Sequence, residues 1–214
     1  MELYRTIKER AEAEIVIERS RFIAHISPVG SREEADDFIA QIRSDHRDAT
    51  HNVPAMVIGE KQQIQWGSDD GEPQGTSGAP MVQMIVSEGL TNLVIVVTRY
   101  FGGIKLGTGG LVRAYTSAAR AAIEEAGICS VCSMGSLKVA VDYSSFEKIR
   151  NMASEAIEED SASFVIDETE YTDKVTMDLL THEENVQALE ERIKNITNGK
   201  MKIEEVSRVV RKMD

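Results

Sequence analysis

The residues best suited to chemistry lie in the glycine-rich stretch "RYFGGIKLGTGG", which runs from residue 99 to residue 110. It stands between a run of β-branched residues and an alanine-rich segment typical of a helix. Glycines at a helix start leave backbone N–H groups uncovered, and such groups bind anions. We therefore predict a phosphate-binding turn, for the phosphate of a nucleotide or of an RNA backbone. The predicted residues are Arg99, Tyr100, Gly102, Gly103, Lys105, Gly107, Thr108, Gly109, Gly110 and Arg113.

The distribution of charge along the chain supports this prediction. The formal net charge is −12, yet residues 89–123 contain no Asp or Glu. Four cations fall inside that segment: Arg99, Lys105, Arg113 and Arg120. An acidic chain therefore carries a positive segment centred on the glycines, which favours an anionic ligand there.

Known phosphate loops match this stretch only in part. Gly102 and Gly107 have the spacing of a Walker A loop, but Thr108 stands where that loop has lysine, and no G-x-G-x-x-G is present. An ordinary ATPase mechanism is therefore not expected. The alternative is structural, because glycines also let a helix turn tightly and pack closely on a sheet. The acid-free segment favours binding over packing alone.

A second polar stretch, "SDDGEPQGTSG" at residues 68–78, supplies a candidate ligand loop. Its three carboxylates could hold Mg²⁺ beside a phosphate, since hard cations prefer oxygen ligands, and "GTSG" could form a small anion nest. The alternative is that these side chains cap turns. No other cofactor is expected, and the metal is left undefined. The predicted loop residues are His51, Asp69, Asp70, Glu72, Thr76 and Ser77.

The remaining histidines and the cysteines form no recognisable site. His46 and His51 are five residues apart, so they share neither a helix face nor a strand face. Cys129 and Cys132 have C-x-x-C spacing, but a closed zinc site needs a second pair that the sequence lacks. The role of the two cysteines is left undefined.

Length and composition indicate a globular protein of one or two domains. The chain has 214 residues, of which 42% are hydrophobic and 28% are charged, and these values are ordinary for globular proteins. No apolar run reaches membrane-spanning length, and the charged N-terminus lacks the apolar segment of a signal peptide. We expect a cytoplasmic protein with reduced thiols and no membrane partner. Its acidity argues against indiscriminate coating of nucleic acid.

Hydrophobic patterns predict an α+β fold of two domains, residues 1–133 and residues 134–214. The first is predicted to contain a strand pair within 13–29, strands at 51–59, 63–67 and 92–100, and helices from Ser31, at 81–89 and at 108–126. The second is predicted to contain strands at 136–143, 161–171, 173–180 and 200–210, and helices at 144–159 and 181–199. This β-α-β-β-α-β order is typical of a ferredoxin-like fold. Capping boxes are predicted at Ser31, Ser144 and Thr181.

Three stretches resemble the YigZ/IMPACT family: "HRDATHNVPAMVIG", "SDDGEPQGTSGAPM" and "VIVVTRYFGGIKLGTGGLVRAY". The resemblance implies that the first domain is a β-α-β sandwich like domains of a small-subunit ribosomal protein, elongation factor G and the GHMP kinases. It implies a second domain similar to the last domain of elongation factor G. The family's matching positions, none an established catalytic residue, are His51, Asp69, Asp70, Gly71, Glu72, Arg99, Gly102, Gly103, Gly107, Gly109 and Gly110.

The resemblance also bears on function. Eukaryotic relatives regulate translation by binding an activator of the general-control kinase, through an N-terminal domain that this sequence lacks, so that partner is not expected here. We expect a protein without catalytic residues that binds RNA or the ribosome in translation. One alternative is an enzyme that binds a nucleotide or phosphorylated substrate with Mg²⁺. Another is an adaptor that presents a surface to a protein partner in translation.

Overall fold

The computed structural model describes residues 1–159 and 164–213. Contacts within the chain divide it into two compact units. One comprises Leu3–Val131 together with the chain end from Lys212, and the other comprises Met1–Glu2 and Cys132–Arg211. The candidate site lies wholly in the first of these units, and each unit is described separately below.

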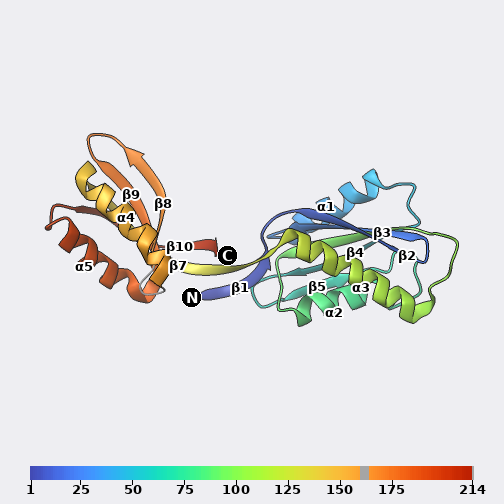
Figure 1. Cartoon of the computed structure of the whole chain (residues 1–214). Coiled ribbons are helices and arrows are strands. Elements are labelled where there is room, and N and C mark those ends of the chain that lie inside the picture. The colour runs from blue at the N-terminus through green and yellow to red at the C-terminus, as the bar shows by residue number, and fades with distance from the viewer. Residues whose placement is uncertain (160–163, 214) are drawn as a thin grey trace. The chain divides into compact units, whose positions relative to one another are not determined.

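A five-stranded sheet forms the centre of the first unit (Figure 1). Its strands, in spatial order, are β2 (Ala11–Ile17), β3 (Ser20–Pro28), β6 (Leu93–Tyr100), β4 (His51–Ile58) and β5 (Ile64–Gly67). Every neighbouring pair is antiparallel. Three helices cover the sheet, namely α1 (Arg32–Asp45), α2 (Gly78–Ser87) and α3 (Gly107–Ala126). The predicted strands and helices of this unit are confirmed.

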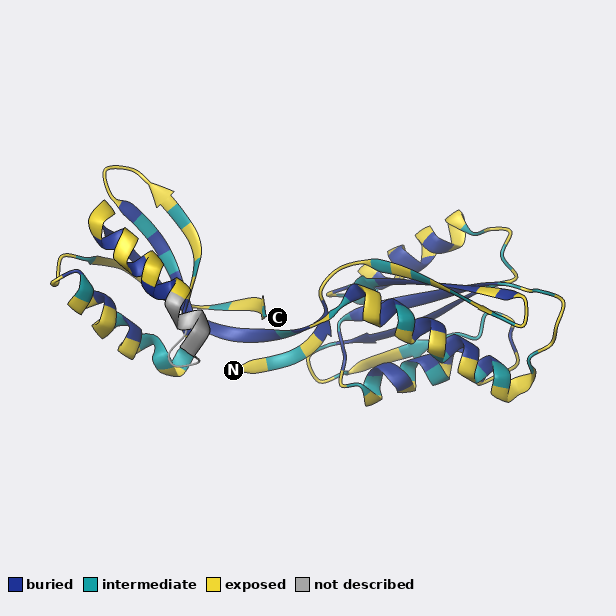
Figure 2. Cartoon of the chain, in the orientation of Figure 1, coloured by how far each residue is buried: buried dark blue, intermediate teal, exposed yellow. Residues whose placement is uncertain are grey.

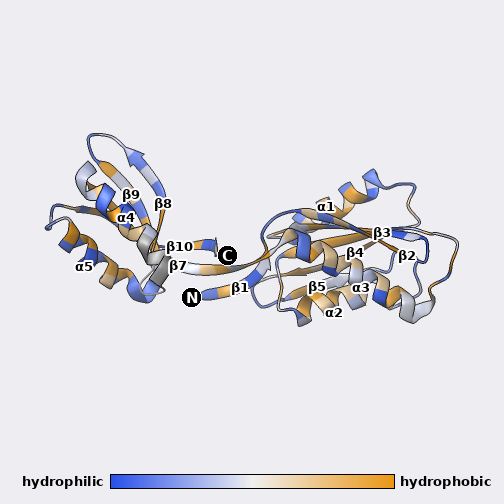
Figure 3. Cartoon of the chain, in the orientation of Figure 1, coloured by the Kyte–Doolittle hydropathy of each residue, from blue (hydrophilic) through white to orange (hydrophobic). Residues whose placement is uncertain are grey.

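The sheet is buried on both faces, with α1 on one face and α2 and α3 on the other. Strand β6 shows why, because its alternate side chains enter two separate cores. Leu93, Ile95 and Val97 pack with α2 and α3, whereas Val94 and Val96 pack with α1. Figures 2 and 3 show the inner strands of this sheet as largely buried and hydrophobic. The same alternation sends Arg99 and Tyr100, at the end of β6, to opposite faces of the sheet.

The second unit follows the predicted β-α-β-β-α-β order. Its elements are β7 (Ile128–Val141), α4 (Tyr143–Glu159), β8 (Val165–Tyr171), β9 (Val175–His182), the 3₁₀ turn η1 (Glu183–Asn185), α5 (Val186–Ile196) and β10 (Lys202–Met213). The sheet order is β1-β7-β9-β8, where β1 is Glu2–Ile7, and β10 pairs with β7. Residues 3–7 of β1, 128–131 of β7 and 212–213 of β10 belong to the first unit. The predicted strand at 161–171 begins outside the described residues, which resume at 164.

Two of the three predicted capping boxes are wrong. At α4 the cap is Asp142, whose Oδ1 accepts from the backbone N–H of Ser145 at 2.7 Å. That backbone bond and the hydroxyls of Ser145 and Ser144 lower the pKa of Asp142 to about 2. At the next helix, Thr181 still pairs within β9, and the helix begins only after the 3₁₀ turn. At Thr181, strand pairing therefore overrides the local capping pattern.

Among the helices of residues 1–159 and 164–213, none combines the length and apolarity needed to cross a membrane.

The predicted cap at Ser31 is confirmed and yields a stability test. Ser31 Oγ accepts from the backbone N–H of Glu34 at 3.2 Å, and Glu34 Oε2 accepts from the N–H of Gly30 at 2.7 Å. We expect Ser31→Ala to lower the free energy of unfolding by about 1 kcal/mol and Ser31→Asp to retain most of it. Urea unfolding can be followed by fluorescence of Trp66, the one tryptophan of the chain. Equal midpoints for the Ala and Asp variants would contradict this role.

Candidate functional site

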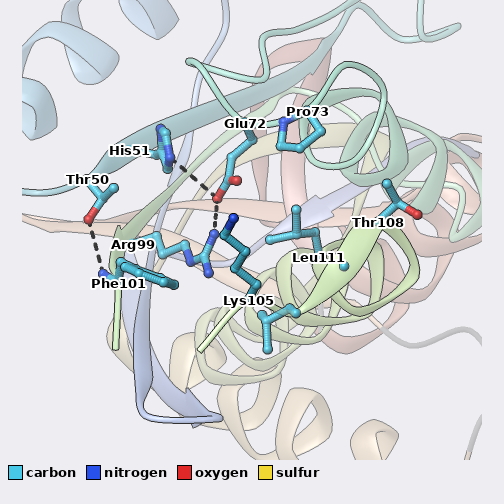
Figure 4. Close-up of a pocket in the computed structure, with 11 residues that line it drawn as sticks. Thr50, His51, Glu72, Pro73, Arg99, Phe101, Lys105, Thr108 and Leu111 are labelled. Atoms are coloured by element: carbon cyan, nitrogen blue, oxygen red, sulfur yellow. Dashed lines mark hydrogen bonds and ion pairs between the residues drawn. The ribbon is translucent and has the colours of Figure 1, made fainter. Parts of the chain in front are cut away.

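A pocket of about 440 Å³ opens where β4 begins and β6 ends, beside the first turn of α3 (Figure 4). The loop between β5 and α2 closes one side of it and the glycine-rich turn closes another. The pocket joins parts of the chain that are far apart in sequence. Its lining residues are Thr50, His51, Glu72, Pro73, Arg99, Phe101, Lys105, Leu106, Gly107, Thr108 and Leu111.

A buried ion pair forms the inner wall of the pocket. Arg99 Nη1 lies 2.6 Å from Glu72 Oε1, and the Tyr115 hydroxyl donates to the same oxygen at 2.7 Å. Arg99 is only 5% exposed, so both charges have lost most of their water. Burial, together with the hydrogen bond to Glu72, raises the pKa of Tyr115 well above its usual value. Tyr115 therefore stays protonated and serves as a permanent donor to the carboxylate.

His51 faces this pair with a defined tautomer. Its Nδ1 lies 2.7 Å from the backbone carbonyl of Asp70, and because a carbonyl only accepts, Nδ1 carries the proton. Nε2 is then turned toward Glu72 Oε1 at 3.8 Å (Figure 4). In the neutral ring Nε2 is a hydrogen-bond acceptor, and in the protonated ring it is a donor that faces the Glu72 carboxylate.

The carboxylates of the predicted ligand loop have separate structural partners. Asp70 accepts from the N–H of Asn52 at 2.7 Å and from Arg43 at 3.0 Å, whereas Glu72 is bound to Arg99. Among the residues that the structure describes, no three His, Cys, Asp or Glu side chains come together as metal ligands. The arrangement that the magnesium alternative needs is not formed by these side chains.

Asp69 occupies the amino-terminal end of α2. Its Oδ1 accepts from the backbone N–H groups of Ser77 and Gly78, each at 3.0 Å, and from the Ser77 hydroxyl at 2.7 Å. Oδ2 accepts from the N–H of Gly75 at 2.7 Å. Burial raises the pKa of Asp69, but these hydrogen bonds outweigh it and hold the pKa below the ordinary 3.8. The predicted "GTSG" anion nest thus surrounds a carboxylate of the chain itself.

Neither α2 nor α3 is capped by the side chain of its own N-cap residue, but Asp69 supplies a carboxylate at α2, and among the described residues no side chain is seen to accept from the first amides of α3. Gly107, Thr108 and Gly109 are exposed, and a Cβ added at Gly107 would meet no atom within 4 Å. A side chain at Gly107 would therefore meet open space, whereas one at Gly110 would lie 2.9 Å from Leu106 Cβ. Such a turn is accessible to an anion.

Gly102 serves packing. A Cβ at this position would lie 2.1 Å from the backbone carbonyl of Arg19, and its N–H donates to Ser20 Oγ at 3.1 Å. Glu18 and Arg19 have φ angles of 47° and 67°, which identify the β2–β3 connection as a tight two-residue turn. Glycine is thus needed for close packing at Gly102, whereas a side chain at Gly107 would meet no neighbouring atom within 4 Å.

Six of the predicted residues line the pocket together: His51, Glu72, Arg99, Lys105, Gly107 and Thr108. Arg113 and Gly110 instead line a neighbouring hollow, which Lys105 also borders. Thr76 is buried and donates to the carbonyl of Pro73 at 2.6 Å. Gly103 and Gly109 are exposed on the turn and on the first turn of α3 without lining the pocket.

Tyr100 lies away from the pocket. Its hydroxyl lies 3.0 Å from His46 Nδ1 and donates to Asp48 at 3.2 Å, and Arg21 stacks 5.5 Å above its ring. The aromatic side chain in the pocket is Phe101. Side chains alternate between the two faces of a strand, so the pattern at the end of β6 could have shown that Tyr100 points away from the face that carries Arg99. Thr50, Pro73, Leu106 and Leu111 also line the pocket, and their residue types gave no sequence signal.

Two of the four cations in the acid-free segment, residues 89–123, form ion pairs in the folded chain. Glu72 neutralises Arg99, and Glu88 lies 2.6 Å from Arg120. Both acids come from outside residues 89–123. Within the described residues, Lys105 and Arg113 are the two cations of that segment without a carboxylate at ion-pair distance, and both are exposed.

The two cysteines, both buried and free, lie three residues apart on the extended strand β7. His46 and His51 contact Tyr100 and Asp70, respectively, rather than each other.

Comparison with known proteins places the site in a defined family. The model of the Impact N-terminal domain matches residues 18–123, and a domain of unknown function, DUF1949, matches residues 139–200. The IMPACT family member YvyE of Bacillus subtilis is 42% identical over 202 residues, which are 94% of this chain and 90% of that protein. The chain therefore belongs to the IMPACT family, and its pocket lies entirely within the Impact N-terminal domain.

Two further matches have different coverage. YigZ of Escherichia coli is 42% identical over 112 residues, which are 51% of this chain and 54% of YigZ. A crystal structure of a hypothetical protein matches with a TM-score of 0.59 at 27% identity and covers 95% of this chain and 97% of its own. Both units of the fold thus occur together in a solved structure.

The packing role of Gly102 can be tested against a neighbouring glycine. We expect Gly102→Ala to lower the free energy of unfolding by at least about 2 kcal/mol, because the new Cβ overlaps backbone atoms. Gly109→Ala is the matched control, since its Cβ would only reach Arg113 Nη1 at 3.7 Å. Urea unfolding by Trp66 fluorescence should show the control to be neutral or slightly stabilised. Equal losses in the two variants would contradict the assignment.

The role of Asp69 predicts a pH-dependent stability. Because its pKa in the folded chain is below 3.8, its stabilisation is present above that pH and is lost as pH falls through the folded value. We expect Asp69→Asn to cost about 2 kcal/mol near neutral pH. The difference in the free energy of unfolding between the unaltered protein and Asp69→Asn should narrow in acid, as measured by urea unfolding. Asp37→Asn, on the exposed face of α1, is the matched control and should leave the free energy of unfolding near neutral pH nearly unchanged.

Proposed function

We propose that this IMPACT-family chain binds RNA, on its own or within the ribosome, and that it acts in translation. Family membership supports a role in the regulation of translation, which is the role that the resemblance implied for eukaryotic relatives. RNA binding is the more specific part of the proposal. It is supported by the chemistry of the first turn of α3.

The observation that carries the proposal is the contrast between two helix starts. The amino-terminal end of α2 is filled by Asp69, whereas at α3 residues 107–109 are exposed and no carboxylate of the described residues is seen to accept from their amides. A phosphate at α3 would take the position that the carboxylate takes at α2. Helix amides and the helix dipole favour such a group.

Two flexible cations flank this turn. Lys105 and Arg113 border one hollow beside it, so a backbone crossing α3 would meet both of them. Because the chain as a whole has a net charge of −12, long-range attraction to RNA is weak. Binding is then confined to RNA whose shape places phosphates at this turn.

The carboxylates that a magnesium-dependent enzyme would use already have protein partners: Asp69, Asp70 and Glu72 each accept hydrogen bonds from protein donors.

A charge-removal pair tests the proposal. We expect Lys105→Ala combined with Arg113→Ala to weaken binding to structured RNA, and to ribosomes at low salt, by about tenfold, or ~1.4 kcal/mol. The slope of log K against log salt should fall by about one to two, because two phosphate contacts are lost. Filter binding and ribosome co-sedimentation are the measurements.

The matched control combines Lys61→Ala and Arg47→Ala, which remove the same charges from exposed positions of the same unit. This control should retain the wild-type affinity and salt slope. Equal weakening in both double variants would indicate a non-specific charge effect. Absence of binding by the unaltered protein at low salt would overturn the proposal.

A further inference from the structure

The pocket contains more than phosphate contacts require. Phosphates of a passing backbone can be held by exposed cations and amides, with no hollow beneath them. Here a pocket of about 440 Å³ adjoins the turn, within the 300–1,000 Å³ typical of small-molecule sites. Much of its wall is apolar, formed by Pro73, Phe101, Leu106 and Leu111. The wall suits a ligand with a sizeable apolar or planar part.

Phe101 is the side chain best placed to receive a planar group. It is 46% exposed at the mouth of the pocket. The guanidinium of Arg99 lies 5.3 Å from its ring centroid and 5.3 Å from that of Phe22. Arg99 therefore supports Phe101 from within and leaves ring surface open to solvent. Such a supported ring is a stacking platform.

Arg99 also has unused donor capacity. Glu72 engages its Nη1 at 2.6 Å, but its buried Nε–H has no acceptor among the described residues. Arg99 lines the pocket together with Phe101, so this donor lies at the pocket wall. A buried donor without a partner is costly, and a polar group on the ligand would satisfy it.

The polar groups of the pocket are divided between two ends. Lys105 and the amides of Gly107 and Thr108 form a positive end, since Glu72 already balances Arg99. At the other end, His51 Nε2 is an acceptor beside the Glu72 carboxylate. A negative group is favoured at the first end and a hydroxyl or amino donor at the second. The ligand should therefore carry one anionic group and donors at a distance from it.

We propose that this pocket is a mononucleotide-binding site. The phosphate lies at the first turn of α3 with Lys105, the base stacks on Phe101, and His51 accepts from a ribose hydroxyl or a base amino group. This assignment rests on the proposed function and narrows it to one nucleotide. The same chemistry is offered by a free nucleoside monophosphate and by a nucleotide of an RNA chain.

Titration calorimetry on the full chain distinguishes these sources. The probes are AMP, adenosine, inorganic phosphate and a short single-stranded oligoadenylate. We expect AMP to bind at least tenfold more tightly than adenosine or phosphate, since each of those lacks one half of the recognised group. Tighter binding of the oligomer than of AMP would identify RNA as the source, and the reverse order would identify a free nucleotide.

Phe101→Ala should weaken AMP binding by about tenfold, given the usual worth of base stacking on an aromatic ring. Phe101→Tyr should restore it. Ile104→Ala is the matched control, because Ile104 is an exposed apolar residue of the same turn that does not line the pocket. Trp66 fluorescence verifies that each variant remains folded.

These measurements test the mononucleotide site separately from the proposed binding to RNA. Absence of AMP binding, or equal AMP affinity in Phe101→Ala and Ile104→Ala, overturns the mononucleotide site. If RNA binding sensitive to Lys105 persists in that case, the proposed function stands alone. AMP binding that depends on Phe101, with no binding to RNA or ribosomes, supports the site and overturns the role in RNA binding.

Discussion

The ion pair between Arg99 and Glu72 determines how the pocket is built. Burying either charge alone is unfavourable, so the strand end and the loop that carry them must meet. The Tyr115 hydroxyl, held protonated by its burial, adds a third connection from α3 to the same carboxylate oxygen. Three elements that are distant in sequence are thereby fixed around one oxygen atom. The residues that face the pocket acquire their positions from this arrangement.

Two glycine-rich stretches of similar composition differ in whether the chain itself supplies an acceptor for the amides of the helix that follows. Each precedes a helix, and each contributes small residues to the start of that helix. The stretch before α2 contains Asp69, which turns back onto the amides and completes the structure internally. The stretch before α3 contains no acid, so its amides have no such partner within the turn. Local sequence therefore decides which of the two helix starts is closed.

Much of the fold could be predicted from the sequence because its signals are local. Apolar alternation located β6, and the cap at Ser31 located the start of α1. The failures came where distant residues decide the outcome. Glu72 neutralises Arg99 from outside the acid-free segment, and pairing of Thr181 within β9 overrides a capping pattern. Tyr100 was assigned to the site by its proximity in sequence, although strand geometry turns it to the other face.

The contact of Gly102 with the β2–β3 turn has a consequence for how this domain can change in evolution. The backbone of Arg19 fills the space that a side chain at Gly102 would need, and Ser20 Oγ accepts from the Gly102 N–H. A hairpin tip is normally where chains tolerate inserted residues. Here an insertion would push against Gly102, which follows the pocket-lining Phe101, so we expect the length of this hairpin and the shape of the pocket to change together in evolution.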